Sequence, residues 1–414
     1  MRARSRNLAV ISVVALIATL AVAPVQVQAQ AVPPLDVQVG AFLGGPSCNF
    51  DTGQGCIPGE GMRYYAPPLK VQAGDVVNFN FQGFHTATLM PRNVDPASWA
   101  SANSGGVGKP YSLFTQDPDD TALDRNGSAA TPSLKANNAA ILPTRPDCGA
   151  VDNPCVYDGN VLNSGVPFAA DTWAVQMEGN PGDTTWVICL VHPHMRLKIT
   201  IVGSAAEATT QQQIDDAKAA MLRQDNESAA SMHRKLLNRQ SKHTDADGET
   251  VWDAWAGWDN HWIALLAFYP QKLVIQKGDT VRWHFTENIY EDHTATFPRS
   301  KAINVASNSF VPWCDPDGDG GPGPDNPPDL QGPPFCSDPS QLEFDIKPRF
   351  AYPQGNGVFY RKDYENSGVR GAPFERNDPW DLTFKRSSAH RPFKYMCLIH
   401  GGFMSAKVAV RPRR

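Results

Sequence analysis

Two short segments of the sequence carry the same combination of metal-binding side chains. Each contains a cysteine, a histidine and a methionine close together: Cys189, His192 and Met195 in the first, and Cys397, His400 and Met404 in the second. Thiolate, imidazole and thioether groups are ligands for soft or borderline transition metals rather than for Mg²⁺ or Ca²⁺. The repeated combination predicts two metal sites of one kind.

An upstream histidine accompanies each segment. His85 and His293 both begin the sequence His-Thr-Ala-Thr, and each lies 104 residues before the cysteine of its segment (189 − 85 and 397 − 293). A type 1 (blue) copper site uses one thiolate and two imidazoles in a plane, with a weak thioether further away. The predicted copper ligands are therefore His85, Cys189, His192 and Met195 at one site, and His293, Cys397, His400 and Met404 at the other.

The same residues have two alternative interpretations. A buried cysteine or methionine often only fills a hydrophobic core, but such residues would have no reason to recur at matched intervals. Structural zinc sites also use cysteine and histidine, yet they favour more thiolates and have no use for methionine. Copper is the metal that this combination favours.

Both halves resemble the cupredoxins, the family that includes plastocyanin, amicyanin and azurin. In that family a histidine is followed, near the end of the domain, by Cys-x(2–4)-His-x(2–4)-Met. Residues 189–198, Cys-Leu-Val-His-Pro-His-Met-Arg-Leu-Lys, are similar to the amicyanin loop, and the segment from Cys397 to Met404 is one residue longer between cysteine and methionine. The resemblance implies electron transfer with a redox protein, such as a cytochrome or another cupredoxin.

A second histidine in the first segment is a rival copper ligand. His194 follows Cys189 at the spacing found in azurins, whereas His192 places Met195 where amicyanin has its methionine. We favour His192, because the second segment offers only His400, which also lies three residues after its cysteine.

Duplicated cupredoxin domains also form nitrite reductases and multicopper oxidases. In those enzymes a histidine directly beside the blue-site cysteine usually reaches a catalytic copper, but here the neighbours are Ile188, Leu190, Met396 and Leu398. We interpret the remaining histidines as surface or structural residues: His233, His243, His261, His284 and His390. The sequence therefore favours an electron carrier, with no catalytic residue, over a copper-dependent oxidoreductase. A copper-binding module without a redox role is a third alternative.

The elements that position these ligands are predicted to be strands. Residues 69–79 and 273–283 share an apolar alternation around a Gly-Asp turn, which is typical of two strands joined by a turn. Short alternating strands with frequent turns predict an all-β fold. We expect two Greek-key β-sandwich domains of the cupredoxin type, spanning residues 32–204 and 250–414.

The segment between them, residues 205–249, has a different composition. Gln, Ala, Asp and Lys are frequent, proline is absent, and Ile214, Met221 and Leu236 recur at near-helical spacing. A partly helical linker is predicted, with a flexible tether as the alternative.

Residues 1–31 resemble a signal peptide. They begin with three arginines, continue with an apolar run over residues 8–22, and end with the small residues Ala29 and Ala31. The run is shorter than the ~20 residues that cross a bilayer, so we expect cleavage, no transmembrane span in the mature chain, and a secreted or periplasmic location. A formal charge of −5 and a pI of about 6.1 argue against nucleic acid as a partner.

Export permits disulfides. Six of the eight cysteines form close sequence pairs: Cys48 with Cys56, Cys148 with Cys155, and Cys314 with Cys336. Six cysteines allow about 15 connectivities, so local pairing is a hypothesis.

Each half carries a long insertion, because the interval between its ligands already equals a whole simple sandwich of about 100 residues. In the second insertion Asp315, Asp317 and Asp319 alternate ahead of two glycines, like the start of a calcium loop, but the expected distant glutamate is missing. Calcium binding and a plain acidic turn are both open.

Overall fold

The structure is a computed structural model, and it describes residues 33–44, 57–123, 129–167, 171–237, 239–286, 290–314, 342–371, 376–388 and 391–413. The chain from Pro34 onward forms one compact unit. The predicted signal peptide, the Cys48/Cys56 pair, the Cys314/Cys336 pair and the acidic turn at Asp315, Asp317 and Asp319 lie outside the described residues or side chains. No helix within the described ranges is long and apolar enough to cross a membrane.

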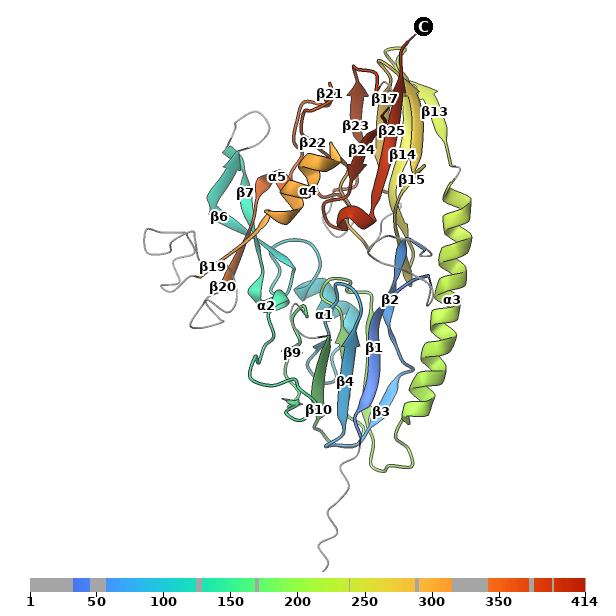
Figure 1. The fold of residues 1–414 in the computed structure, drawn as a ribbon. Helices are drawn as coiled ribbons and strands as arrows, with labels where there is room; N and C mark the ends of the chain where they lie inside the picture. The colour runs from blue at the N-terminus through green and yellow to red at the C-terminus, as the bar shows by residue number, and fades with distance from the viewer. Residues whose placement is uncertain are drawn as a thin grey trace, which may run out of the picture. The chain divides into compact units, whose positions relative to one another are not determined.

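An eleven-stranded sheet runs through both halves of the sequence (Figure 1). Its order is β21-β23-β17-β14-β15-β2-β1-β4-β10-β8, and β13 pairs with β14. The strands are β1 (Leu35–Phe42), β2 (Gly59–Tyr65), β4 (Val76–Phe81), β8 (Cys155–Tyr157), β10 (Thr172–Met177), β13 (Ser241–Thr244), β14 (Thr250–Asp259), β15 (Ile263–Tyr269), β17 (Thr280–His284), β21 (Val358–Phe359) and β23 (Trp380–Phe384).

The order of this sheet repeats on the two sides of its β2–β15 pair. β1 is parallel to β4, and β14 is parallel to β17. Each of these pairs is followed by an antiparallel neighbour, β10 or β23, and then by a parallel edge strand, β8 or β21. The repeated topology agrees with the duplication that the ligand motifs predict.

Two smaller sheets pack against the large one, one in each half. The first has the order β3-β12-β11-β5-β9 and the second has the order β16-β25-β24-β18-β22. Their strands are β3 (Leu69–Val71), β5 (Thr88–Leu89), β9 (Leu162–Asn163), β11 (Thr184–Ile188), β12 (Arg196–Ile201), β16 (Lys272–Gln276), β18 (Thr296–Phe297), β22 (Glu365–Asn366), β24 (Phe393–Met396) and β25 (Ser405–Arg411).

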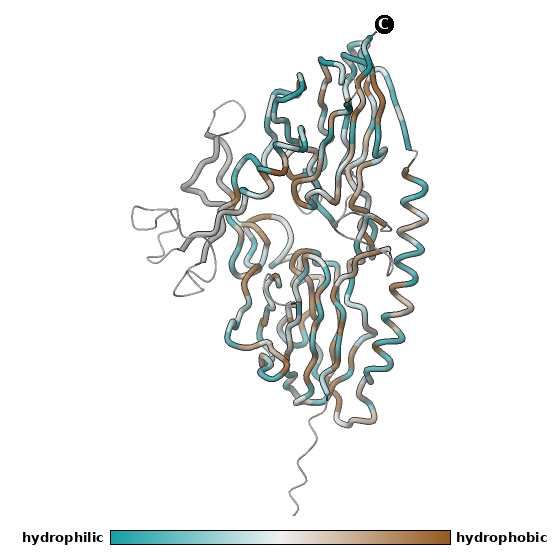
Figure 2. The backbone as a smooth tube through the Cα atoms, viewed as in Figure 1, coloured by the Kyte–Doolittle hydropathy of each residue, from teal (hydrophilic) through white to brown (hydrophobic). Residues whose placement is uncertain are grey.

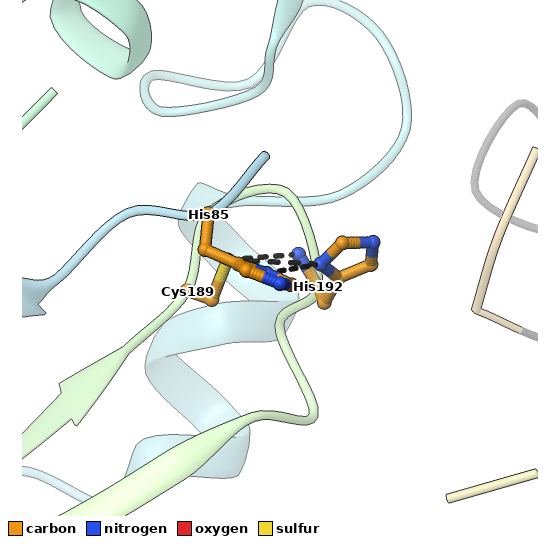
Figure 3. Close-up of side chains that lie close together, drawn as sticks. All are labelled: His85, Cys189 and His192. Carbon is orange, nitrogen blue, oxygen red and sulfur yellow. Dashed lines mark hydrogen bonds between the residues drawn. The ribbon is translucent and has the colours of Figure 1, made fainter. Parts of the chain in front are cut away.

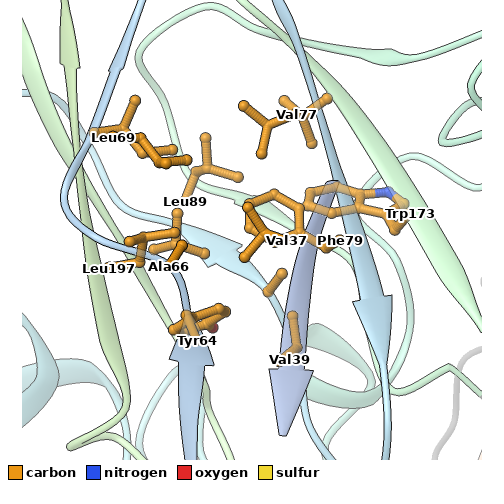
Figure 4. Packing of buried hydrophobic residues seen from close by; sticks show 14 of the residues in the cluster. Val37, Val39, Tyr64, Ala66, Leu69, Val77, Phe79, Leu89, Trp173 and Leu197 are labelled. Atoms are coloured by element: carbon orange, nitrogen blue, oxygen red, sulfur yellow. The ribbon is translucent and has the colours of Figure 1, made fainter. Parts of the chain in front are cut away.

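A hydrophobic core fills the space between the sheets of each half. In the first half, Val37 and Phe79 from the large sheet pack with Leu89 and Leu197 from the small sheet (Figure 4). In the second half the core is aromatic, and the Phe297 and Tyr395 rings stack with centroids 4.5 Å apart. Burying one such side chain contributes about 1.5–3 kcal/mol. The prediction of an all-β sandwich fold is confirmed, while the domain boundaries stay predictions.

The two halves share backbone hydrogen bonds in the large sheet. β2 and β15 are antiparallel, with Gly59, Glu60 and Gly61 opposite Leu265, Ala264 and Ile263. The insertions also pair with each other in a four-stranded sheet of order β19-β20-β7-β6, made of β6 (Phe114–Leu123), β7 (Ala129–Ala136), β19 (Phe310–Cys314) and β20 (Leu342–Ile346).

The linker contains one long helix, α3 (Gln211–Leu237), rather than a flexible tether. Teal, hydrophilic residues dominate it in Figure 2, whereas brown, hydrophobic ones concentrate in the strands. Its buried residues contact both halves, because Ile214 joins the core of the first half and Ala229 and Leu236 pack with residues of β15. The amphipathic spacing seen in the sequence therefore buries one face of the helix against the large sheet.

The remaining elements are short and lie in the insertions and ligand loops. They are α1 (Pro96–Asn103), α2 (Asn138–Ile141), α4 (Arg299–Ser307), α5 (Pro348–Ala351) and a 3₁₀ turn, η2 (Gly401–Phe403). The disulfide predicted between Cys148 and Cys155 is formed, and it closes a loop of the first insertion.

Candidate metal centres

The first centre lies where loops of the two sheets of the first half meet. His85 comes from the connection between β4 and β5, and Cys189 follows β11. His192 and Met195 lie in the turn between β11 and β12. The Cys189 Sγ atom is 3.9 Å from Nδ1 of His85 and 3.8 Å from Nδ1 of His192, and the two nitrogens are 3.1 Å apart (Figure 3).

The second centre repeats this arrangement. His293 precedes β18, Cys397 follows β24, and His400 and Met404 flank the η2 turn that leads into β25. Nδ1 of His400 lies 3.5 Å from the Cys397 Sγ atom and 3.2 Å from Nδ1 of His293. The structure thus brings together a histidine, a cysteine and a second histidine in each half.

The donor atoms fit one metal ion at each centre. Ligand atoms bound at about 2.0–2.3 Å to a single ion lie about 3–4 Å from each other, as these do. Cys189, His85 and Met195 are fully buried, and so are Cys397, His293 and Met404. Each methionine lies in the same loop as its cysteine, and a methionine thioether is the usual weak further ligand of a blue copper site.

Each sulfur accepts hydrogen bonds from the backbone. Thr86 N and His192 N donate to the Cys189 Sγ atom at 3.4 Å, and Thr294 N donates to the Cys397 Sγ atom at 3.3 Å. The hydroxyls of the same threonines accept from Leu190 N and Leu398 N, both at 2.8 Å. These bonds connect the segment that carries the upstream histidine to the loop that carries the cysteine. The N–H···S bonds also stabilise negative charge on the sulfur.

Both cysteines are poised to be thiolates. Burial opposes ionisation, but His192 and His85 face the Cys189 sulfur and hold the pKa of its thiol well below the usual range. The pKa of the Cys397 thiol is likewise well below the usual range, because His400 and His293 outweigh the effect of burial. The thiolate is the form of cysteine that binds metals.

A buried glutamate that the sequence reasoning missed contacts both centres. Glu291 Oε2 lies 2.6 Å from Nε2 of His192, and Glu291 Oε1 lies 3.1 Å from Nε2 of His400. Burial favours a neutral carboxyl, but His192 and His400 hold the pKa of Glu291 well below its usual range. Glu291 is therefore a carboxylate shared by one histidine from each half.

The sequence contains one indication of this glutamate, which is a difference in length between the two halves. The Gly-Asp turn lies 11 residues before His85 in the first half (85 − 74) and 15 residues before His293 in the second (293 − 278). The second half is thus four residues longer just ahead of its upstream histidine, where Glu291 stands.

His194 does not face the cysteine. Its ring lies against the ring of Tyr290, with centroids 3.7 Å apart, and neither ring nitrogen has a hydrogen-bond partner. Burial, with a smaller effect from His192 and His261, lowers the pKa of His194 to about 2. The structure therefore brings His192, and not His194, to the Cys189 sulfur.

The other described histidines are held by local partners. His233 Nδ1 lies 2.8 Å from the Tyr269 hydroxyl, and His284 donates to Asp253 at 2.7 Å. His243 also lies beside Asp253, His261 lies beside Tyr290, and His390 is outside the described residues. Within the described chain, one further cluster of potential ligands, Glu60 with His192 and Glu291, shares its histidine with the first centre.

Comparisons with known proteins return blue copper proteins. Auracyanin A from Chloroflexus aurantiacus is 16% identical and matches 40% of this chain and 100% of its own, with a TM-score of 0.20. A mutant of amicyanin in its reduced Cu(I) form is 16% identical over 41% of this chain and 92% of its own, with a TM-score of 0.16. The chain is similar to cupredoxins.

A copper enzyme is also among the similar structures. The copper-containing nitrite reductase from Thermus scotoductus is 11% identical and matches 92% of this chain and 69% of its own, with a TM-score of 0.18. No protein-family model matches the sequence, and no curated protein matches it. The geometry of the two centres indicates the function of the chain.

Proposed function

We propose that this protein is an electron carrier that holds a type 1 copper ion at each of its two centres. The observation that carries the proposal is the repeated convergence of two histidine Nδ1 atoms on a buried cysteine sulfur, with a buried methionine in the same loop. The ligands would be His85, Cys189, His192 and Met195 at the first centre, and His293, Cys397, His400 and Met404 at the second.

Copper in such a ligand set supplies a one-electron couple between Cu(I) and Cu(II). The chain contributes a fixed environment, because the cysteines follow strands directly. Backbone N–H groups of Thr86 and His192 hold the Cys189 sulfur, and that of Thr294 holds the Cys397 sulfur. Residues that cannot move far keep the ligand geometry similar in both oxidation states, which favours fast electron transfer over catalysis at the metal.

Three further features belong to the same proposal. The residues beside each cysteine are aliphatic or methionine, which supports a carrier over a copper-dependent oxidoreductase with a linked catalytic copper. The N-terminal pattern supports export to the periplasm or the exterior. The partner would be a redox protein, such as a cytochrome or another cupredoxin.

Metal analysis combined with visible and EPR spectra tests the proposal. We expect two copper ions per chain, both with type 1 spectra, and one blue centre lost in each of the Cys189→Ser and Cys397→Ser proteins. A type 2 copper signal in the wild-type protein would instead favour an oxidoreductase. Electron exchange with a small cytochrome separates a carrier from a copper-binding module without a redox role.

A further inference from the structure

The Glu291 carboxylate occupies the space between the two metal centres. One of its oxygens bonds Nε2 of His192 from the first half, and the other bonds Nε2 of His400 from the second half. The glutamate is 7% exposed and His192 is 2% exposed, so water has little access to the contact between them, while the His400 side chain is 13% exposed. Each carboxylate oxygen thus contacts a histidine of a different centre.

These contacts complete a continuous path between the two sulfurs. His192 faces Cys189 through Nδ1, and His400 faces Cys397 through Nδ1, so the opposite edges of the same two rings meet at Glu291. A histidine that binds a metal through one nitrogen donates the proton on its other nitrogen, often to a carboxylate. Both rings therefore present an Nε2–H group to the same acceptor.

The surrounding structure holds the glutamate in place. Asp259 Oδ2 accepts hydrogen bonds from the backbone N–H groups of Tyr290 and Glu291, at 2.9 and 3.0 Å. Asp259 is the last residue of β14, which pairs with β15, and β15 pairs in turn with β2 of the first half. The shared sheet therefore fixes Asp259, which in turn holds the backbone of Glu291.

We infer that Glu291 couples the two copper centres, so that they exchange an electron within one chain through His192, Glu291 and His400. The inference rests on the proposed function. In each exchange one copper loses the electron and the other gains it, and no proton, outside oxidant or reductant is consumed. The protein is thus a single two-centre unit rather than two independent carriers on one chain.

The placement of the carboxylate argues against a purely structural ion pair between the halves. Sheet pairing between β2 and β15 and the packing of α3 already join the halves without it. An ion pair that only joined the halves would need one of these two histidines, whereas Glu291 contacts in each half a histidine whose other nitrogen faces the thiolate.

The test begins by distinguishing the two centres. The Cys189→Ser and Cys397→Ser proteins each keep one blue centre and so give the optical and EPR spectra of that centre alone. In the wild-type protein, pulse radiolysis then reduces a small share of the copper, and the redistribution between centres is followed with those spectra. We expect a rate that does not depend on protein concentration. A rate proportional to concentration means exchange between molecules and overturns the inference.

Two substitutions of Glu291 and one control variant test whether the electron exchange depends on this residue. Glu291→Gln removes one acceptor oxygen, and Glu291→Asp keeps the charge but shortens the side chain, so neither maintains both hydrogen bonds. We expect each to slow the redistribution about tenfold or more while both blue spectra persist. Asp381→Asn removes a carboxylate that bonds Arg282 rather than a ligand histidine, and it should leave the rate unchanged. An unchanged rate in both Glu291 variants overturns the inference.

A second readout does not depend on electron transfer. In the diamagnetic Cu(I) protein, the Nε2–H protons of His192 and His400 should both give slowly exchanging NMR signals. Both signals should shift in Glu291→Gln and neither should shift in Asp381→Asn. If only one responds, the carboxylate does not join the centres. A wild-type protein without copper refutes the proposed function itself, whereas two blue coppers that do not exchange electrons refute only the coupling.

Discussion

Gly40 lies directly against the imidazole ring of His85. A Cβ atom at this position would be 2.2 Å from both Nε2 and Cδ2 of the ring, and the backbone has a φ of +69°. No side chain fits without displacing the histidine. We therefore expect Gly40→Ala to lower the copper affinity of the first centre by about 10–100-fold and to leave the second centre intact, as measured by copper titration of each blue absorption.

Gly74→Ala is the matched control for this substitution. Gly74 also has a positive φ, of +93°, but no atom lies within 4 Å of a Cβ built there. Both variants therefore carry the backbone strain of a left-handed alanine, whereas only Gly40→Ala crowds His85. Equal losses of copper in the two variants would show that strain, and not displacement of His85, is responsible.

The two histidines of the first loop should respond differently to substitution. His192 Nδ1 faces the Cys189 sulfur at 3.8 Å, whereas His194 lies against Tyr290 and is not directed at it. We expect His192→Ala to abolish the blue absorption of the first centre and His194→Ala to preserve it. The spectrum of the Cys397→Ser background shows this centre alone, and loss of blue colour in His194→Ala would assign the ligand to His194.

The ligand sets could be predicted because they are repeated. His85 and His293 are far from their cysteines in sequence, but the shared His-Thr-Ala-Thr and equal intervals connect them to Cys189 and Cys397. Glu291 could not be found in this way, because a lone carboxylate has no counterpart in the first half. Its role depends on the relative position of the halves, which no local pattern encodes.

The strand pairing that joins the two halves could not be predicted from the sequence either. Gly59-Glu-Gly61 is too short and too rich in glycine to show the alternation of a strand, yet it pairs with Ile263–Leu265 of the second half. The apolar spacing of Ile214 and Leu236 did predict the helix of the linker. Which strands that helix covers follows from tertiary packing, so the sequence pattern indicated the element without its position.

Helix α3 is anchored to the first half by a buried ion pair. Asp225 accepts from Arg63 Nη2 at 2.5 Å and from the Tyr65 hydroxyl at 2.8 Å, and it is 1% exposed. Removing one partner of a buried pair costs about 3–5 kcal/mol, because the other charge is left unpaired. We expect Asp225→Ala to lower the free energy of unfolding by this amount in chemical denaturation.

The exposed Glu227 on the same helix provides the comparison for Asp225. A substitution of Glu227 by alanine keeps helix propensity high and changes the unfolding free energy by about 0.5 kcal/mol or less. Similar losses in the two variants would mean that helix formation, and not the Arg63–Asp225 contact, determines the effect.

Acid should weaken the second half through Asp253. Burial alone would raise the pKa of this carboxyl, but the hydrogen bond from His284 at 2.7 Å and the nearby His243 lower it below its ordinary value. A carboxyl with a lowered folded-state pKa stabilises the fold above its unfolded pKa of about 3.9, and this contribution disappears as the pH falls through the folded value. The wild-type protein should therefore lose stability below about pH 4.

Asp253→Asn tests this contribution, because the amide cannot ionise. We expect the variant to be less stable than the wild type by about 1–3 kcal/mol near neutral pH, the worth of a hydrogen bond to a charged group. Denaturation curves recorded at several pH values should show this difference shrinking as the pH falls below about 4. Asp381→Asn removes an exposed partner of Arg282 and should cost less than about 1 kcal/mol. If the Asp253→Asn difference stays constant across this range, the ionised carboxylate of Asp253 is not the source of the stability.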